Sequence, residues 1–565
     1  MAEKHSNDSN AGYPKMTQTI LISSNQPLAN DLAGELSYAT LVSPQDFSAA
    51  IANAVYIYLP HSADRDGMIP DLDEARGVFQ YVVEQKCRHF ILLSSALIYG
   101  TGPNRPPFVD EGYCAPGNAE GRIRDRWESL ESLATSQLGD RTTLTIFRLC
   151  PIAGSSSFPA RLFSRSIVPT LPGHDPVFQL LSVKDLAQAV RCAIEQQKPG
   201  TYNVAPDTVV PLHQAIRLTR GTRIPIPRTL TRVIRRADAL EFLRYSWTIS
   251  NRRIKSELGF IPSTSSVAAL GHQCNGSFGV HLKDRLSPEA AKESSFDPYG
   301  MDKDYIRFYG KTLFKFLSEF YWRIEDKGLE HIPSQGRAVL VGMHRGFMPF
   351  DGVMALHTMV KKTGRYPRFL THPGLLKFPF LANFMTKLGG VVACQESADQ
   401  LLEDDQLLGI FPEGIHGAFT LYRDSYKLQA FGRDAFVKLA LRHRAPIIPF
   451  VTLGSAEIFP ILAKIKSRRW TRYSDWPFIP ITPTFPLLPV PLPSKWHTQF
   501  LPPISIEQYP PEAAENRAVV KAISRQVRTS MQQAIDDLRS RRRSIFFGSI
   551  FERSADESQS KPVPI

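Results

Sequence analysis

The chain has 565 residues and a mass of 63.4 kDa, which predicts two or three domains of ordinary size. Hydrophobic residues make up 43% and charged residues 21%, a balance that excludes wholesale disorder, a coiled coil and a collagen-like fibre. The net charge is +13, of which +10 (39 basic and 29 acidic residues) lies after residue 270 and +3 (28 and 25) before it. Such an excess predicts an anionic partner, such as nucleic acid, an anionic membrane surface or a phosphorylated substrate.

The six cysteines are scattered without a C-x-x-C pair, which predicts a reducing compartment and no structural zinc site. The first residues, MAEKHSNDSNAGYP, have no apolar core of a signal peptide, so we expect a polar leader over residues 1–16. No stretch offers about 18 to 20 uninterrupted apolar residues, and we expect no transmembrane helix. These features favour a location on the cytoplasmic side.

Strand-sized apolar runs alternate with helix-sized segments in the first half of the chain. The runs are Thr19–Ser23, Ala54–Leu59, His89–Ser94 and Leu144–Leu149. This alternation predicts a parallel sheet of βαβ units, a Rossmann-like α/β domain over residues 17–265. Ser, Gly, Pro and charged residues then predict a linker over residues 266–297.

A second alternation predicts another α/β domain over residues 298–545, followed by a tail over 546–565. We expect an amphipathic helix from Asp302 through Tyr305, Leu313, Phe316 and Phe320. Strands are expected at Ala338–Gly342, Leu407–Phe411 and Ile447–Phe450, with helices at Gly352–Lys362, Asp434–His443 and Ala513–Arg541. The proline-rich stretch Trp476–Pro493 cannot be a helix interior or a central strand and predicts an extended surface segment.

The N-terminal half carries four segments in a recognisable order: HFILLSSALIYG, LTIFRLCPIAG, LLSVKDLAQAV and GTYNVAPD. In this order they resemble the extended short-chain dehydrogenases and NAD-dependent sugar-nucleotide epimerases. The resemblance implies a Gly-rich turn after the first strand and a Y-x-x-x-K pair. Here the turn reads SSNQPLAND, and NAEGRIRDRWE has no tyrosine at the matching place. We therefore expect a degenerate domain that does not bind NAD(P), with Ser94 and Ser95 as the residual candidates for a ligand contact.

Three motifs stand out in the C-terminal half: AVLVGMHRGFMPFDG, LLGIFPEGIHG and RAPIIPFVTLGS. Their type and order resemble the glycerolipid acyltransferase family, the lysophosphatidic acid acyltransferase-like enzymes. Acyl transfer from a thioester to an alcohol needs a base for a weakly acidic hydroxyl, and a neutral imidazole suits that task. His344 is the expected base and Asp351 its orienting partner, although six residues separate them instead of the family's usual four. No metal or cofactor is required, and acyl-CoA or acyl-carrier protein is the expected co-substrate.

The resemblance also implies substrate-binding residues. Phe411, Pro412, Glu413 and Gly414 form the motif associated with the acceptor headgroup, and Pro446 and Pro449 belong to the motif associated with the acyl donor. The segment Leu388–Gln400 lacks the arginine that binds an acceptor phosphate in the family. Either Arg345, Arg423 or Lys427 substitutes for it, or the acceptor is a neutral or zwitterionic lipid alcohol.

A membrane-facing segment is expected at Lys464–Trp476, where basic residues alternate with aromatic ones, and the basic end of the last helix continues into RRRSIFF. We expect peripheral binding to anionic lipid and no nucleic-acid partner, because no zinc-finger, RRM or KH motif accompanies the charge. The leading hypothesis is an acyltransferase of phospholipid or glycerolipid synthesis fused to a degenerate epimerase-like domain. Two alternatives stay open: a bifunctional protein with an active NAD(P)-dependent domain, and a non-catalytic lipid-binding scaffold.

Overall fold

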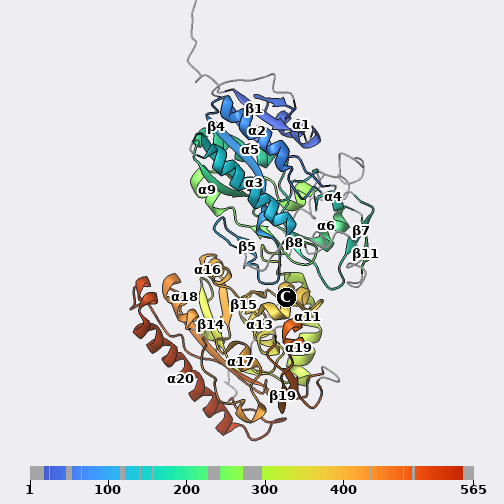
Figure 1. The fold of residues 1–565 in the computed structure, drawn as a ribbon. Coiled ribbons are helices and arrows are strands. Elements are labelled where there is room, and N and C mark those ends of the chain that lie inside the picture. The colour runs from blue at the N-terminus through green and yellow to red at the C-terminus, as the bar shows by residue number, and fades with distance from the viewer. Residues whose placement is uncertain are drawn as a thin grey trace, which may run out of the picture. The chain divides into compact units, whose positions relative to one another are not determined.

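The computed structural model describes residues 18–24, 26–45, 54–64, 67–114, 121–139, 141–155, 158, 160–163, 165–219, 221–226, 242–270, 296–432, 434–474, 476–485 and 490–551. The chain forms two compact units, the first from most residues up to 293 and the second from most residues from 294 on (Figure 1). The expected leader lies outside the described residues, as do residues 271–295 of the expected linker and 552–565 of the expected tail.

The N-terminal unit is built on a six-stranded parallel sheet in the order β2-β1-β3-β4-β6-β9. Its strands are β1 (Thr19–Ser23), β2 (Ala39–Val42), β3 (Val55–Leu59), β4 (His89–Ser95), β6 (Thr143–Leu149) and β9 (Gly200–Val204). Strands β1 and β3 are buried throughout, as expected for a sheet covered on both faces. The chain places β2 and β3 on opposite sides of β1, a reversal typical of doubly wound folds, and the predicted Rossmann-like domain is confirmed.

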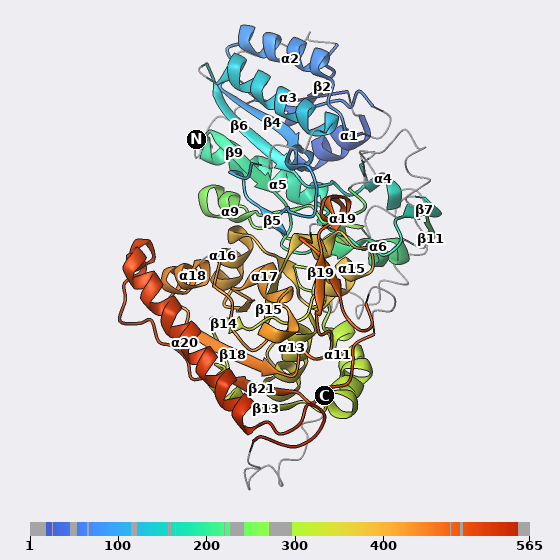
Figure 2. The same ribbon diagram turned by 60° about the horizontal axis from the view of Figure 1, so that its bottom comes forward.

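Helices cover both faces of this sheet. Helices α2 (Leu72–Glu84) and α3 (Arg122–Leu138) pack together on one face, and α1 (Gln26–Glu35) and α5 (Val183–Gln196) pack together on the other (Figure 2). The remaining elements are short: η2 (Ala96–Tyr99), β5 (Phe108–Val109), α4 (Ala160–Phe163), β7 (Ile167–Thr170), β8 (Val177–Phe178), β10 (Val210–Pro211), α6 (Leu212–Leu218), β11 (Thr222–Pro225), β12 (Thr248–Ile249) and α9 (Arg252–Leu258).

The C-terminal unit is built on a seven-stranded sheet in the order β13-β21-β18-β14-β17-β15-β16, and only the β18–β21 pair is antiparallel within its described strands. Its strands are β13 (Glu325–Lys327), β14 (Ala338–Gly342), β15 (Arg368–Thr371), β16 (Val391–Val392), β17 (Leu407–Ile410), β18 (Ile447–Leu453) and β21 (His497–Phe500). The three expected strands are the central ones, β14, β17 and β18. The predicted second α/β domain is therefore confirmed.

Helices α18 (Ala435–His443) and α20 (Arg517–Arg541) lie on one side of this sheet, and α11 (Lys303–Lys311) and α13 (Phe350–Thr363) lie on the other (Figures 1 and 2). Helix α20 packs on β18 with a buried apolar stripe, which includes Ile523, Val527, Met531 and Ile535. The other helices and strands are α12 (Leu313–Lys315), the π-helix η3 (Phe316–Tyr321), η4 (Leu329–His331), α14 (Pro373–Leu376), α15 (Leu381–Lys387), α16 (Gln395–Glu403), α17 (Gly414–Ala418), η5 (Tyr422–Asp424), β19 (Ala463–Ile465), α19 (Arg468–Ser474), β20 (Ile479–Ile481) and η6 (Pro511–Glu515).

The helix expected from Asp302 through Phe320 is not continuous. Thr312, with φ −114° and ψ −97°, ends α11, and the chain continues as α12 and the wider π-turns of η3. This break rotates the later side chains, so that Phe314 is buried and Phe316 is exposed. The expected apolar stripe was wrong for this reason, because a continuous 3.6-residue period no longer applies beyond Thr312.

The stretch Trp476–Pro493 also differs from its expected role as an extended surface segment. Residues Ile479–Ile481 form β20, which pairs with β19 as an antiparallel ribbon. Trp476 is buried among aromatic rings, including those of Phe347 and Phe419. Proline spacing excluded helix and central strand correctly, but it carried no information about burial of the aromatic side chains.

Candidate active site

His344 and Asp351 meet at the carboxyl end of β14. The Nδ1 atom of His344 lies 2.7 Å from Oδ2 of Asp351, so the predicted hydrogen-bond contact is confirmed. The same carboxylate accepts the backbone N–H of Arg345 at 3.0 Å and that of Gly352 at 2.9 Å. The intervening loop turns back at Gly346, whose φ of +79° favours glycine. The two extra residues relative to the usual spacing are therefore accommodated within this turn.

The surroundings of the His344–Asp351 pair determine which imidazole nitrogen can accept a proton. The Asp351 side chain is 0% exposed and lies in the first turn of α13, where the helix dipole favours a carboxylate; that of His344 is 14% exposed. A carboxylate at Nδ1 favours the tautomer in which Nδ1 carries the proton. Nε2 is then a free base, and within the described part of the chain it has no hydrogen-bond partner. His344 also lines a cavity, so this base faces a space that a substrate can enter.

Strand register brings the second motif to the same edge. Val341 of β14 is paired in parallel with Ile410 of β17. His344 and Glu413 each lie three residues beyond this pair, which places both just past the carboxyl ends of neighbouring strands. Motifs about 70 residues apart in the sequence therefore converge because parallel strands end at one edge.

Arg345 and Glu413 form a buried ion pair with two contacts, Nη1–Oε2 at 2.8 Å and Nη2–Oε1 at 3.0 Å. Arg345 also donates to the backbone oxygens of His344, Ser425 and Lys427. Its side chain is 1% exposed and that of Glu413 is 0% exposed. The donors of Arg345, an expected contact of an acceptor phosphate, are thus used inside the protein. The carboxylate of Glu413, an expected contact of the acceptor headgroup, is enclosed by Arg345.

Phe411 lies directly beside the imidazole, with ring centroids 5.1 Å apart. The backbone of Gly342 allows this position, since a Cβ there would stand 2.5 Å from the Phe411 ring and 2.4 Å from the Phe450 ring. Sequence reasoning identified Phe411 through its motif and missed the requirement for Gly342. The VGMH sequence contained the signal, a glycine at the end of a buried strand just before the expected base.

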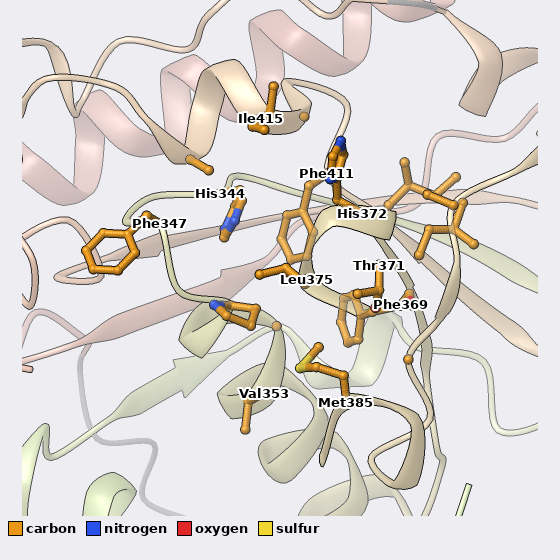
Figure 3. Close-up of a pocket in the computed structure, with 18 of the residues that line it drawn as sticks. His344, Phe347, Val353, Phe369, Thr371, His372, Leu375, Met385, Phe411 and Ile415 are labelled. Carbon is orange, nitrogen blue, oxygen red and sulfur yellow. Dashed lines mark hydrogen bonds between the residues drawn. The ribbon is translucent and has the colours of Figure 1, made fainter. Parts of the chain in front are cut away.

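The cavity in front of His344 has a volume of about 220 Å³ and an almost entirely apolar lining. Figure 3 shows His344 and Phe411 together at this cavity, with Val353 and Met385 farther along it. The other lining residues are Phe347, Pro349, Gly352, Leu356, Phe369, Leu370, Thr371, His372, Leu375, Leu388, Gly390, Ala393, Ile410, Gly414, Ile415, Ala418, Phe419 and Trp476. Among these described residues there is no Lys, Arg, Asp or Glu. The cavity is suited to an apolar chain, and sequence reasoning missed most of its lining.

Other expected binding residues lie outside this cavity lining. The Arg423 side chain is 79% exposed and lies 3.3 Å from Asp424, and the Lys427 side chain is exposed. Pro449 is buried in β18 and its backbone oxygen accepts the N–H of Leu501, and the Pro446 oxygen accepts that of Val339. These two prolines pack and hold the sheet. Pro412 precedes Glu413 and its oxygen accepts the backbone N–H of Gly432.

The two serine candidates of the N-terminal unit have structural contacts. Ser94 is buried and donates to Glu131 at 2.6 Å, and Ser95 caps the η2 turn by accepting the N–H of Leu97. Glu131 also pairs with Arg148 at 2.7 Å, and four residues earlier on α3 stands Trp127. Trp127 and Glu131 thus have the four-residue spacing of a Y-x-x-x-K pair. At this site beside Ser94 they stand where the resemblance implies Tyr and Lys.

The turn after β1 is occupied by an acidic side chain. Glu74, in the first turn of α2, accepts hydrogen bonds from Ser24 and from the Tyr58 hydroxyl, the latter at 3.0 Å. Burial and the nearby Glu74 carboxylate raise the pKa of Tyr58 above its ordinary value. A carboxylate therefore lies near the end of β1, where a dinucleotide's pyrophosphate would need positive potential.

The basic segment Lys464–Trp476 begins within β19 and includes α19. The ammonium groups of Lys464 and Lys466 lie over the Phe478 ring, at 5.2 and 5.9 Å from its centre. Burial lowers the pKa of Lys464. Arg468 and Arg469 are exposed, whereas Trp476 is buried at the cavity. Trp476 is thus not an interfacial aromatic residue, a correction to the expected membrane face.

The described residues contain neither a membrane-spanning helix nor a metal-binding cluster. No helix in the described ranges combines the length and apolar character needed to cross a bilayer. In the same ranges, no three His, Cys, Asp or Glu side chains are grouped so that they could hold a metal ion.

Comparison with known proteins gives one match that lies within the C-terminal unit: the Acyltransferase family model matches residues 323–453. An uncharacterized protein of Mycobacterium tuberculosis (strain H37Rv) is 38% identical over 274 residues, covering 47% of this chain and 75% of the relative. An uncharacterized protein of Mycobacterium leprae is 37% identical over 278 residues, 47% and 73% of the two chains. Phytyl ester synthase 2, chloroplastic, of Arabidopsis thaliana is 27% identical over 150 residues, 25% of this chain and 21% of that protein.

Similar solved structures include MoeE5 in complex with UDP-glucuronic acid and NAD, at 13% identity and a TM-score of 0.38, over 48% of this chain and 100% of that chain. UDP-glucuronic acid 4-epimerase from Bacillus cereus is similar at 12% identity and a TM-score of 0.38, over 48% and 99%.

Proposed function

Since residues 323–453 belong to the acyltransferase family, we propose that this chain transfers a fatty acyl chain from a thioester to a lipid hydroxyl. One observation carries the proposal: Nδ1 of His344 is held 2.7 Å from Asp351, while the imidazole lines an apolar cavity. A base beside an apolar space is what an acyl-transfer reaction on a lipid needs.

The proposed reaction uses His344 as a general base. Nε2 removes the proton from the acceptor hydroxyl as its oxygen attacks the thioester carbonyl. The C–S bond then breaks, and the imidazolium returns the proton to the departing thiolate. Asp351 stabilises the imidazolium and keeps the ring oriented. The products are an oxygen ester and a free thiol, and no covalent acyl-enzyme forms.

The acyl chain would occupy the cavity that runs from His344 past Phe411 toward Met385 (Figure 3). Buried apolar area supplies about 25 cal/mol per Å², so such a chain gains affinity from a lining of Phe, Leu, Val and Met. The donor would be acyl-CoA or acyl-carrier protein, and no metal or cofactor is required by this chemistry.

The acceptor we propose is a neutral or zwitterionic lipid alcohol, in phospholipid or related lipid synthesis. Two observations favour this choice over a phosphomonoester: Arg345 is already paired with Glu413, and the described lining of the cavity has no Lys or Arg. A phosphate dianion without a cation would bind poorly. The phytyl ester synthase relative, by its name, forms an ester of an apolar alcohol.

The test is an acyl-transfer assay with the purified full chain. Labelled acyl-CoA and acyl-carrier protein serve as donors, and lysophosphatidic acid, lysophosphatidylcholine, monoacylglycerol and a long-chain alcohol serve as acceptors. We expect a labelled ester with the neutral or zwitterionic acceptors. Transfer to lysophosphatidic acid alone would contradict the acceptor assignment, and no transfer to any acceptor would contradict the activity.

A further inference from the structure

Four phenylalanine side chains stand exposed on two segments of the C-terminal unit. Phe316 and Phe320 of the π-helix η3 are 52% and 65% exposed, and Phe546 and Phe547 are 45% and 71% exposed. We call these four residues the phenylalanine face. By contrast, Phe314 and Trp322, which flank these exposed rings in the sequence, are almost fully enclosed. Large apolar side chains grouped at a surface mark an interaction site.

Direct contacts hold the two segments together. Arg323, two residues after η3, donates from Nη2 to the Phe546 oxygen at 2.5 Å, and its guanidinium lies 5.5 Å from the centre of the Phe547 ring. The N–H of Lys495 donates to the Ile545 oxygen at 2.8 Å. The residues that follow α20 are thereby fixed beside the end of η3. Within η3 the rings of Phe316 and Phe320 stack with centroids 6.5 Å apart.

Several cations lie close to these rings in the sequence. Lys311, Lys315 and Arg543 are exposed, and Arg323 contacts the segment that carries Phe546 and Phe547. Glu319, on the same π-turns, is neutralised by Lys361 at 2.9 Å. The local balance is therefore positive around an apolar centre. That combination fits the interface of an anionic bilayer, where aromatic rings enter the headgroup region and Lys or Arg bind acidic headgroups.

We propose that the phenylalanine face docks this protein on an anionic lipid bilayer, with Phe316, Phe320, Phe546 and Phe547 entering the interface. This docking proposal rests on the proposed function only in that the bilayer would supply the lipid acceptor for acyl transfer. It differs from the expectation based on Lys464–Trp476, because it places the apolar contact on η3 and the segment after α20. The binding itself can be measured without any acyl donor.

The experiment is co-sedimentation of the full chain with vesicles of phosphatidylcholine containing phosphatidylglycerol, compared with pure phosphatidylcholine. The test variants are Phe546→Ser with Phe547→Ser, and Phe316→Gln with Phe320→Gln. A matched control is Ile167→Ser with Ile261→Ser, which removes two exposed apolar side chains, 57% and 69% exposed, from the N-terminal unit. Thermal melting verifies that each variant folds.

We expect wild type and the control to bind anionic vesicles alike, and each test variant to bind about tenfold or more weakly, since binding scales with the apolar area inserted. Test variants that bind like wild type would overturn the proposal. Wild-type protein that does not bind anionic vesicles but self-associates through these residues would also overturn the proposal and would indicate a protein partner. Transfer to an acceptor dispersed in detergent, measured in parallel, separates failure of docking from failure of the proposed activity.

Discussion

The guanidinium of Arg345 meets the carboxylate of Glu413 in a buried, two-point ion pair, 2.8 and 3.0 Å across its two contacts. Arg345 follows His344 on the loop after β14, and Glu413 lies on the loop after β17. The pair therefore joins the two loops that enclose the cavity. Glu413 also accepts the backbone N–H of Gln429 at 2.6 Å, which ties in a third loop. Both residues act here as positioning residues.

Glu413→Gln removes the charge and keeps the side-chain size, so Arg345 is left buried without its anion. We expect a loss of about 3 to 5 kcal/mol in the free energy of unfolding, the usual effect of breaking a buried pair, and a fall in acyl-transfer turnover. Urea denaturation and the transfer assay measure the two effects. Arg423→Gln is the control, since its exposed ion pair with Asp424 contributes little. Equal stability of Glu413→Gln and wild type would contradict the positioning role.

Val353→Phe tests the assignment of the cavity to the acyl chain. Val353 lines the cavity from α13, and a larger ring there occupies space needed by a long chain. We expect kcat/KM for a long-chain acyl-CoA to fall at least about tenfold while that for a short-chain acyl-CoA changes little, at a stability cost of about 1 to 3 kcal/mol. Val490→Phe, at an exposed position, is the control. A proportional fall for both donors would indicate general damage to the site.

NAD(P) should not bind the N-terminal unit at physiological concentrations. The turn after β1 lacks glycine, and Glu74 places a carboxylate near Ser24 at that turn. A pyrophosphate would meet a negative charge instead of free backbone N–H groups. Calorimetric titration of the full chain with NAD and with NADP should show no heat of binding, and micromolar affinity would overturn the prediction.

Replacement of Lys464, Lys466, Arg468 and Arg469 by Gln tests the basic segment around β19 and α19. We expect weaker vesicle binding with a smaller salt dependence, because exposed charges are screened over about 8 to 10 Å at physiological ionic strength. Activity on a bilayer substrate should fall, and activity on substrate dispersed in detergent should be spared. Equal loss of both activities would mean that these residues support the site or the fold.

The sequence predicted the strands well, because buried parallel strands read as continuous apolar runs, as in Val55–Leu59 and Ala338–Gly342. It also predicted the His344–Asp351 contact from a motif. The buried ion pair and hydrogen bonds of Arg345 could not be predicted. Its partner Glu413 and its backbone acceptors at Ser425 and Lys427 are distant in the sequence and meet only in the folded chain. The burial of Trp476 could not be predicted from the sequence either, because a proline-rich stretch has no periodicity that indicates which side chains are buried.

The break at Thr312 had only one sequence signal, Gly310 in the last turn of α11, and no proline lies near it. A single glycine inside an otherwise periodic pattern does not by itself mark a helix end. Packing decides instead, since Phe314 is buried and lies near His357 with ring centroids 5.9 Å apart. Tertiary contacts therefore overrode local periodicity, which is why Phe316 and Phe320 became exposed.

The most direct test of the central claim is the turnover of His344→Ala in the acyl-transfer assay, beside Asp351→Asn and the control His416→Ala, an exposed histidine on α17. Loss of the base predicts a fall of about 10² to 10⁴-fold or more in turnover for His344→Ala, with a melting temperature close to wild type. Asp351→Asn should also impair turnover by weakening the orientation of the imidazole, and His416→Ala should be near normal. Near-normal turnover of folded His344→Ala would contradict the account.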